Sequence, residues 1–191
     1  MKALIIVDMQ NDFVEGGALG VDGGSTAAQK LAKDFEEMKG NYGVIATTQD
    51  WHIDPGSHFA PEGENPNFVD NWPVHCVKGT DGAEIVDELK SVLKGNVDID
   101  IKKGQYEDAY SGFMGKTEDG KTLQDSLHEY GVTEVDIVGI ATDYCVAESA
   151  IDASKNGFKV NILSNYVATI NQERLEMIKN NQFVEFNVNY I

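Results

Sequence analysis

The sequence is poor in cysteine and has no long apolar run, and each shortage narrows what the protein can be. Its 191 residues include only two cysteines, Cys76 and Cys145, too few for a disulfide framework. We therefore expect both thiols to be free and the location to be reducing and cytoplasmic. The apolar run near the N-terminus stops at Asp8, too early for a signal peptide, and no run is long enough to span a bilayer.

Basic residues are also scarce, with 15 Lys and Arg against 32 Asp and Glu and a formal net charge of -17. This balance argues against nucleic acid or an anionic membrane as a partner, because both require a positive face. It does not indicate a cationic substrate, because excess surface acid commonly serves solubility alone. Repeats and low-complexity linkers are lacking too, which predicts a single domain over residues 1–191. The sequence is compatible with a homo-oligomer but carries no pattern that indicates one.

Five short, nearly continuous apolar runs are typical of parallel strands buried on both faces of a sheet. They cover residues 3–7, 44–48, 97–101, 135–140 and 160–163, and an alternating sixth run, 183–188, is expected at an edge. Helical patterns lie between them, among them one announced by a capping-box pair, Asp81 and Glu84, and a last one from Thr169. This alternation predicts an α/β fold, a three-layer α/β/α sandwich with a mainly parallel central sheet of about six strands.

Chemically active residues follow three of the predicted strands. Asp8, Lys103 and Cys145 end or follow the first, third and fourth runs. A lone Asp there is more often a turn acid, and a free Cys more often a small buried hydrophobe. However, ligands of such sheets bind at the carboxyl ends of the strands, where these three side chains would share one rim. A helix N-terminus and an ammonium group both stabilise a thiolate, and a carboxylate accepts its proton, so the set predicts a cysteine nucleophile.

A second group of candidates gathers after the second predicted strand. Asp50 and His52 are two residues apart and can share one ion in an extended segment, and His58 and His75 follow in the same loop region. One carboxylate with three imidazoles suits one divalent metal ion, with zinc favoured and iron(II) or manganese as alternatives. The fourth histidine, His128, is expected to be exposed on a helix and uninvolved.

Residues 115–122 also fit the phosphate-binding pattern G-x-x-x-x-G-K-[ST]. That pattern requires a buried strand immediately before it, which residues 110–114 do not form, and Glu118 and Asp119 would repel phosphates. We interpret the segment as a solvated loop that opens the next helix, with Thr122 as its cap.

Several short motifs occur in order from the start of the chain to about residue 165. They are Asp8-Met9-Gln10-Asn11-Asp12-Phe13, Gly16-Gly17-Ala18-Leu19, Thr48-Gln49-Asp50-Trp51-His52, Ser57-His58-Phe59, Trp72-Pro73-Val74-His75-Cys76-Val77, Lys103-Gly104, Tyr110-Ser111-Gly112-Phe113 and Gly139-Ile140-Ala141-Thr142-Asp143-Tyr144-Cys145-Val146. Together they resemble the nicotinamidase/pyrazinamidase branch of the isochorismatase-like cysteine hydrolases. The segment beyond Asn165 carries little of this pattern, so the sequence assigns it no part in substrate binding.

The resemblance implies an amidohydrolase that converts nicotinamide, and also pyrazinamide, to the acid and ammonia through a Cys thioester, in NAD salvage. Asp8 would take the thiol proton and pass it to the leaving ammonia. Lys103 would hold the arrangement and favour the thiolate, and Cys145 would attack the carboxamide carbon. Backbone N–H groups of Ala141 and Cys145 would meet the oxyanion, and the peptide before Ala141 is typically cis in that family.

The same resemblance implies that a metal held by Asp50, His52, His58 and His75 binds the pyridine nitrogen. Phe13, Trp72 and Tyr110 would contact the ring, with core packing as the alternative for Tyr110. An isochorismatase or a carbamoyl or ureido amidase is the nearest alternative, since either would keep Asp8, Lys103 and Cys145 without the metal loop. More distant alternatives are an iron(II) oxygenase and a non-enzymatic metal-binding module.

Overall fold

A six-stranded parallel sheet runs through the centre of the protein, whose computed structural model describes residues 1–191. The strands are β1 Lys2–Val7, β2 Val44–Asp50, β3 Ile99–Lys103, β4 Glu134–Ile140, β5 Lys159–Ala168 and β6 Val188–Tyr190. Their order across the sheet is β3-β2-β1-β4-β5-β6, and every pairing is parallel. This confirms the predicted α/β class and sharpens the mainly parallel sheet to a fully parallel one.

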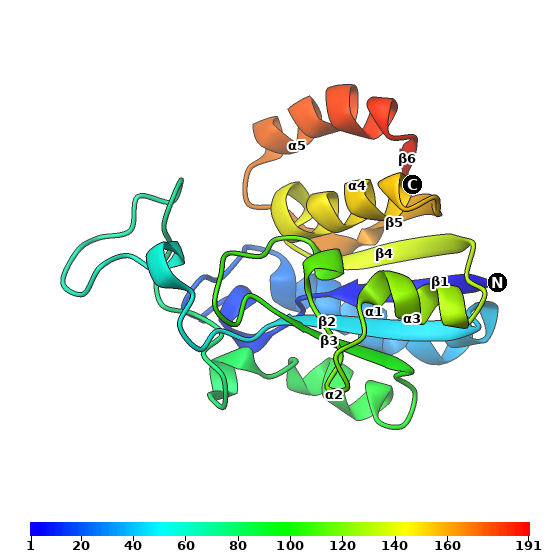
Figure 1. The fold of residues 1–191 in the computed structure, drawn as a ribbon, viewed down its shortest axis with the longest axis horizontal. Coiled ribbons are helices and arrows are strands. Elements are labelled where there is room, and N and C mark those ends of the chain that lie inside the picture. The colour runs from blue at the N-terminus through cyan, green and yellow to red at the C-terminus, as the bar shows by residue number, and fades with distance from the viewer.

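Helices cover both faces of the sheet, as the sandwich prediction requires (Figure 1). The helices are α1 Gly24–Met38, α2 Asp87–Leu93, α3 Leu123–Glu129, α4 Ala147–Lys155 and α5 Gln172–Ile178. Buried side chains of α1 and α2 belong to one core cluster, and those of α3, α4 and α5 belong to the other. The sheet therefore separates two hydrophobic cores.

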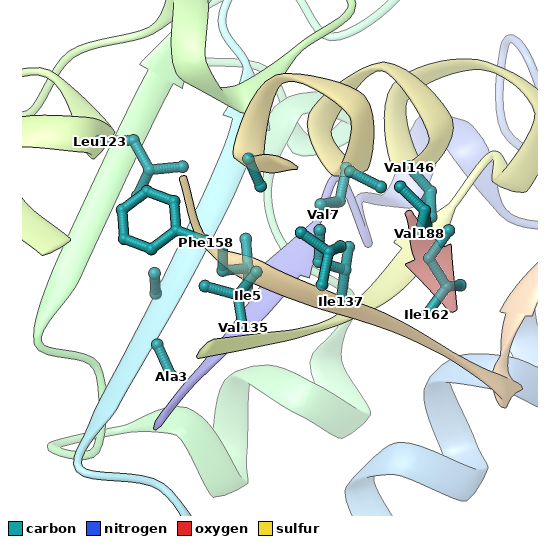
Figure 2. Packing of buried hydrophobic residues seen from close by; sticks show 14 of the residues in the cluster. Ala3, Ile5, Val7, Leu123, Val135, Ile137, Val146, Phe158, Ile162 and Val188 are labelled. Atoms are coloured by element: carbon teal, nitrogen blue, oxygen red, sulfur yellow. The ribbon is translucent and has the colours of Figure 1, made fainter. Parts of the chain in front are cut away.

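Strand β1 shows why the runs are almost wholly apolar. Ala3, Ile5 and Val7 pack in the core beneath α4, while Leu4 and Ile6 pack in the core beneath α1 (Figure 2). Because successive side chains of a strand point to opposite faces, a strand between two helical layers needs an apolar residue at every position. A polar residue can follow only where the strand leaves both cores, which is where Asp8 stands.

Two sequence predictions about element boundaries are wrong. The run 183–188 is not the last strand, because Phe186 donates its N–H to the carbonyl of Gln182 in a helical pattern and β6 begins only at Val188. Asp81 and Glu84 do not cap a helix either. Ile85 forms a bridge with Gln10, which keeps that backbone extended, and α2 begins only at Asp87.

Other local predictions are confirmed. Thr122 caps α3 by accepting the N–H of Asp125 at 3.1 Å, so residues 115–122 form the loop that opens this helix. Cys76 and Cys145 are both free thiols, and His128 lies exposed on α3. None of the helices is long and apolar enough to cross a bilayer.

Candidate active site

The strand order reverses direction between β1 and β4, and a cavity opens there at the carboxyl ends of the strands. The cavity encloses about 440 Å³ and is lined mainly by apolar side chains. Phe13, Trp72, Tyr110 and Ala141, all expected near the substrate, lie in its wall together with Cys145. This volume is near the lower end of the roughly 300–1,000 Å³ usual for small-molecule sites, so it suits a compact ligand.

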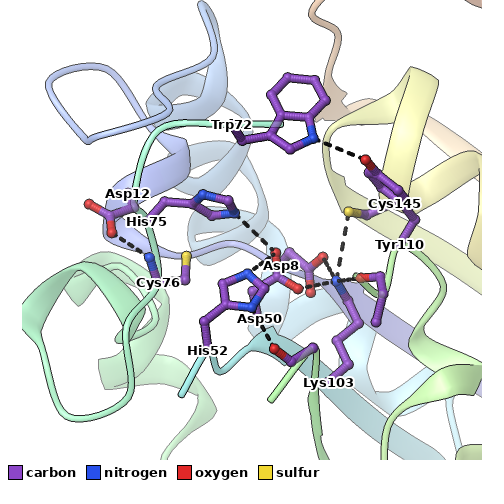
Figure 3. Close-up of polar contacts among 12 residues, drawn as sticks. Asp8, Asp12, Asp50, His52, Trp72, His75, Cys76, Lys103, Tyr110 and Cys145 are labelled. Atoms are coloured by element: carbon purple, nitrogen blue, oxygen red, sulfur yellow. Dashed lines mark hydrogen bonds and ion pairs between the residues drawn. The ribbon is translucent and has the colours of Figure 1, made fainter. Parts of the chain in front are cut away.

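Lys103 connects the predicted catalytic residues in the buried part of this site (Figure 3). Its Nζ lies 2.9 Å from Oδ2 of Asp8 and 3.8 Å from Sγ of Cys145, donates to the carbonyl of Ala109 at 2.8 Å, and ion-pairs with Asp50. Lys103 is the last residue of β3, and Asp8 directly follows β1. The topology therefore brings the three strand-end residues together, as the sequence predicts.

Asp8 is held in one orientation by its neighbours. Its Oδ1 accepts the hydroxyl of Thr48 at 2.7 Å, and its backbone takes a φ of +48°, in the left-handed region that turns the chain away from the sheet. Burial raises the pKa of Asp8 and nearby Asp50 adds to this, although Lys103 acts in the opposite direction. A carboxylate with a raised pKa is the stronger base, which suits a group that must take a proton from a thiol.

The thiol of Cys145 differs from the expectation of an activated thiolate. Cys145 lies in a π-helical turn, Thr142–Val146, which leads directly into α4, so it does sit at the start of a helical segment. Burial nevertheless raises the pKa of Cys145 well above its usual value. Lys103 lowers it, but Asp8 and Asp50 raise it again. One ammonium shared between two carboxylates leaves the thiol protonated, so Asp8 is needed to deprotonate it during attack.

Three imidazoles gather at the other end of the cavity, and their ligand atoms all lie within 4.8 Å of one another. Nδ1 of His52 lies 2.5 Å from the carbonyl of Gly104, and Nδ1 of His75 lies 2.7 Å from the carbonyl of Pro73. Since a carbonyl only accepts, both rings carry their proton on Nδ1 and present the lone pair of Nε2. The His52 Nε2 atom is buried without any hydrogen-bond partner, as expected of a metal ligand.

Asp50 completes this group and joins it to Lys103. Its Oδ2 lies 3.6 Å from Nε2 of His52 and 3.7 Å from Nε2 of His75, close to the roughly 3.4 Å that separates two ligands of a tetrahedral zinc. Burial alone would raise the pKa of Asp50, but Lys103 and hydrogen bonds from the histidines outweigh it and hold that pKa well below its usual value. Burial lowers the pKa of His58 to about 4, so its ring is neutral near pH 7. The donor set therefore fits a divalent ion.

The aromatic side chains form the cavity wall rather than core filling. Nε1 of Trp72 donates to the hydroxyl of Tyr110 at 3.0 Å (Figure 3), and the ring of Phe13 lies 5.4 Å from that of His75. The alternative that Tyr110 only packs in the core is therefore not what the structure shows. The peptide bond between Ile140 and Ala141 is cis, as the resemblance implies.

Sequence reasoning missed several supporting residues, although Gln10, Asp12 and Thr48 stand within the motifs that carry the resemblance. Gln10 is fully buried and hydrogen-bonds the backbone of Asp50 through both ends of its side-chain amide. Asp12 accepts the N–H of Cys76 at 2.7 Å and so fixes the backbone beside His75. Polarity at buried positions just after a strand was the available signal.

The segment beyond Asn165 also contributes, contrary to the sequence expectation. Ile170 lines the cavity, and Tyr144 lies beside it in the wall. A single half-exposed Ile in a loop carries no pattern by which its role could be recognised.

Comparison with known proteins agrees with this arrangement. The family model described as the isochorismatase domain matches residues 2–188. A nicotinamidase/pyrazinamidase of Mycobacterium tuberculosis is 43% identical over 91% of this chain and 89% of its own length. The solved structure of the yeast nicotinamidase superimposes with a TM-score of 0.86 at 30% identity, covering 100% of this chain and 99% of the other. A pyrazinamidase of Pyrococcus horikoshii, solved in complex with zinc, gives 0.77 at 35% identity, covering 100% and 98%.

The family match spans nearly the whole chain, and the M. tuberculosis relative aligns with about nine-tenths of it. This chain therefore belongs to the isochorismatase family.

Proposed function

We propose that this protein is an amidohydrolase that converts nicotinamide and water to nicotinate and ammonia, and that it accepts pyrazinamide in the same way. Its place would be the salvage of NAD precursors in the cytoplasm. The observation that carries the proposal is the contact of Lys103 with Asp8, Asp50 and Cys145 beneath an apolar cavity that ends at three imidazoles. A nucleophile at one end and a metal-ligand set at the other suit a ring that carries both a carboxamide and a nitrogen atom.

The proposed reaction has two halves. Sγ of Cys145 attacks the carboxamide carbon while Asp8 takes the thiol proton, and the backbone N–H groups of Ala141 and Cys145 stabilise the oxyanion. The C–N bond then breaks, Asp8 returns its proton to the nitrogen, and ammonia leaves a thioester on Cys145. Water attacks the thioester carbon and gives a proton to Asp8, the C–S bond breaks, and the thiol regains that proton.

Asp50, His52, His58 and His75 would hold the metal ion. A bound divalent ion, zinc first and iron(II) or manganese as alternatives, would supply a Lewis acid that anchors the ring nitrogen. The zinc complex of the P. horikoshii pyrazinamidase supports this assignment. Phe13 and Trp72 would contact the ring, and the apolar wall would keep bulk water from the thioester.

The test is ammonia release from nicotinamide by the purified protein, before chelation, after chelation and after metal is added back. Release that is lost on chelation and restored by metal supports both the substrate and the metal site. A Cys145→Ala variant should release no ammonia, and retained activity would contradict a thioester route.

Absence of release by protein that still holds metal would overturn nicotinamide as the substrate. Carbamoyl and ureido amides would then be tested next, because other members of the family would keep Asp8, Lys103 and Cys145.

A further inference from the structure

Ile170 stands at the mouth of the active-site cavity. It lies in the loop between β5 and α5 and is 47% exposed, whereas the other lining residues are buried or half-buried. A side chain that faces both the cavity and the solvent marks the opening through which a ligand enters. Its size therefore decides how far a bound ligand can extend outward.

The loop that carries Ile170 is tied to the turn that carries the nucleophile. The carboxylate of Asp143 is fully buried, and its two oxygens accept the N–H groups of Ile170 and Asn171, each at 3.0 Å. Next to it, the hydroxyl of Thr142 donates to the carbonyl of Ala168 at 2.9 Å. Asp143 precedes Cys145 by two residues, so the position of Ile170 is set relative to the attacking sulfur.

Arg174, the single arginine of the sequence, strengthens the same connection from α5. Its Nε donates to the carbonyl of Asp143 at 2.9 Å, and its guanidinium lies 4.4 Å from the centre of the Tyr144 ring. Tyr144 also lines the cavity. Although Ile170 is exposed, its backbone is thus held in place on both sides.

The orientation of the substrate decides which atoms would meet Ile170, and this step rests on the proposed function. Asp8 and Lys103, at most 1% exposed, form the floor between Asp50 and Cys145. With the ring nitrogen at the imidazole end and the carboxamide at Cys145, ring carbon 2 faces this floor. Ring carbon 5 is on the opposite side of the ring and therefore faces the mouth.

We propose that Ile170 is a specificity-determining residue that limits the size of substituents at ring carbon 5, and that Asp143 is the positioning residue that keeps it there. A nicotinamide with a bulky alkyl group at carbon 5 would collide with the Ile170 side chain while its carboxamide still reached Cys145. Smaller residues at position 170 would admit it.

The experiment compares nicotinamide with 5-propylnicotinamide, whose three added carbons match those that Ile170→Ala removes. The readout is the ratio of kcat/KM for the two substrates, which does not change if part of a preparation is simply inactive. Ile170→Ala should raise the ratio for the propyl substrate by about tenfold or more, the usual scale for added apolar groups in a pocket. Ile170→Phe should lower it, and Asp143→Asn should shift it in the same direction as Ile170→Ala, because the amide can satisfy only one of the two N–H groups.

Met177→Ala is the matched control, because Met177 is an exposed apolar residue of α5 outside the cavity. It should leave the ratio unchanged. A ratio in Ile170→Ala that stays within about twofold of the wild type would overturn the role of Ile170 whatever Asp143→Asn does. Failure of the wild type to hydrolyse nicotinamide at all would instead overturn the proposed function, and this inference with it.

Discussion

The side-chain amide of Gln10 brackets the backbone of Asp50. Its Nε2 donates to the Asp50 carbonyl at 2.8 Å, and its Oε1 accepts the Asp50 N–H at 2.9 Å. The two residues are 40 positions apart, and neither is more than 4% exposed. The residues that follow β1 therefore support the metal-ligand set as well as the catalytic carboxylate, since Gln10 lies two positions after Asp8.

Gln10→Ala should weaken metal binding by about 10–100-fold, the usual cost of losing a group that orients a ligand. It should also destabilise the fold by about 1–3 kcal/mol, because buried N–H and carbonyl groups of Asp50 lose their partner. Metal titration and denaturant unfolding measure the two effects. Gln49→Ala is the control, because Gln49 donates to the same Ala83 carbonyl as Gln10 but does not bond Asp50. Equal metal affinity in both variants would contradict the role of Gln10.

His58→Ala should abolish stoichiometric metal binding and raise KM for nicotinamide while the fold stays intact. The His58 side chain makes no hydrogen bond within the protein, and the lowered pKa, about 4, keeps the ring neutral as a ligand must be. Metal content by elemental analysis and the melting temperature are the measurements. His128→Ala, at an exposed histidine of α3, should keep its metal. Unchanged metal content in His58→Ala would remove this residue from the ligand set.

Asp8→Asn should lower kcat by about 10²–10⁴-fold, because the amide can still accept the Thr48 hydroxyl but cannot take a proton from the thiol. Metal content should be unaffected, since Asp8 contacts Lys103 and not the histidines. Steady-state kinetics together with metal analysis distinguish this outcome from general damage to the site. A variant with near-normal kcat would show that another group serves as the base.

Iodoacetamide should modify Cys145 and spare Cys76. Cys145 lines the cavity, whereas Cys76 is fully buried and burial raises its pKa strongly. Because the pKa of Cys145 is also raised, its alkylation rate should climb as the pH rises above neutral rather than level off near pH 7. Peptide mass spectrometry over a pH series gives both results. Faster modification of Cys76 would mean that the wrong cysteine has been assigned as nucleophile.

Glu15→Gln should destabilise the protein near neutral pH but not in strong acid. The Glu15 carboxylate accepts the N–H groups of Gly23 and Ser25 at 2.7 and 2.8 Å and so caps α1, and hydrogen bonds from Ser25 and Gly23 lower its pKa to about 2. The contribution is complete above the usual value of 4.5 and is lost as the pH falls toward 2. The difference in melting temperature from wild type should shrink over that range.

Glu62→Gln is the comparison for this experiment, because Glu62 is exposed and has no hydrogen-bond partner. Its melting temperature should follow that of the wild type at every pH. A difference for Glu15→Gln that stays constant down to pH 2 would exclude the capping role.

The sequence by itself determined the layered fold and the residues at the strand ends. A parallel strand between two helical layers must be apolar at every position, so its end shows in the sequence as the first polar residue. Asp8 follows such a run, and Asp50 and Lys103 close the neighbouring strands. Short elements with weak patterns were placed less well, as β6 and the start of α2 show, because contacts with distant segments decide them.

Only the tertiary structure decided which groups meet and in what electrostatic state. That Lys103 is shared between Asp8 and Asp50, and that Cys145 stays protonated, follows from distances and burial that no spacing along the chain encodes. The same holds for Ile170, whose loop reaches the cavity because β5 lies next to β4 and Asp143 holds the backbone there. The physical reason is that apolar patterning records whether a residue is buried, whereas pairing between polar side chains depends on how separate loops pack against one another.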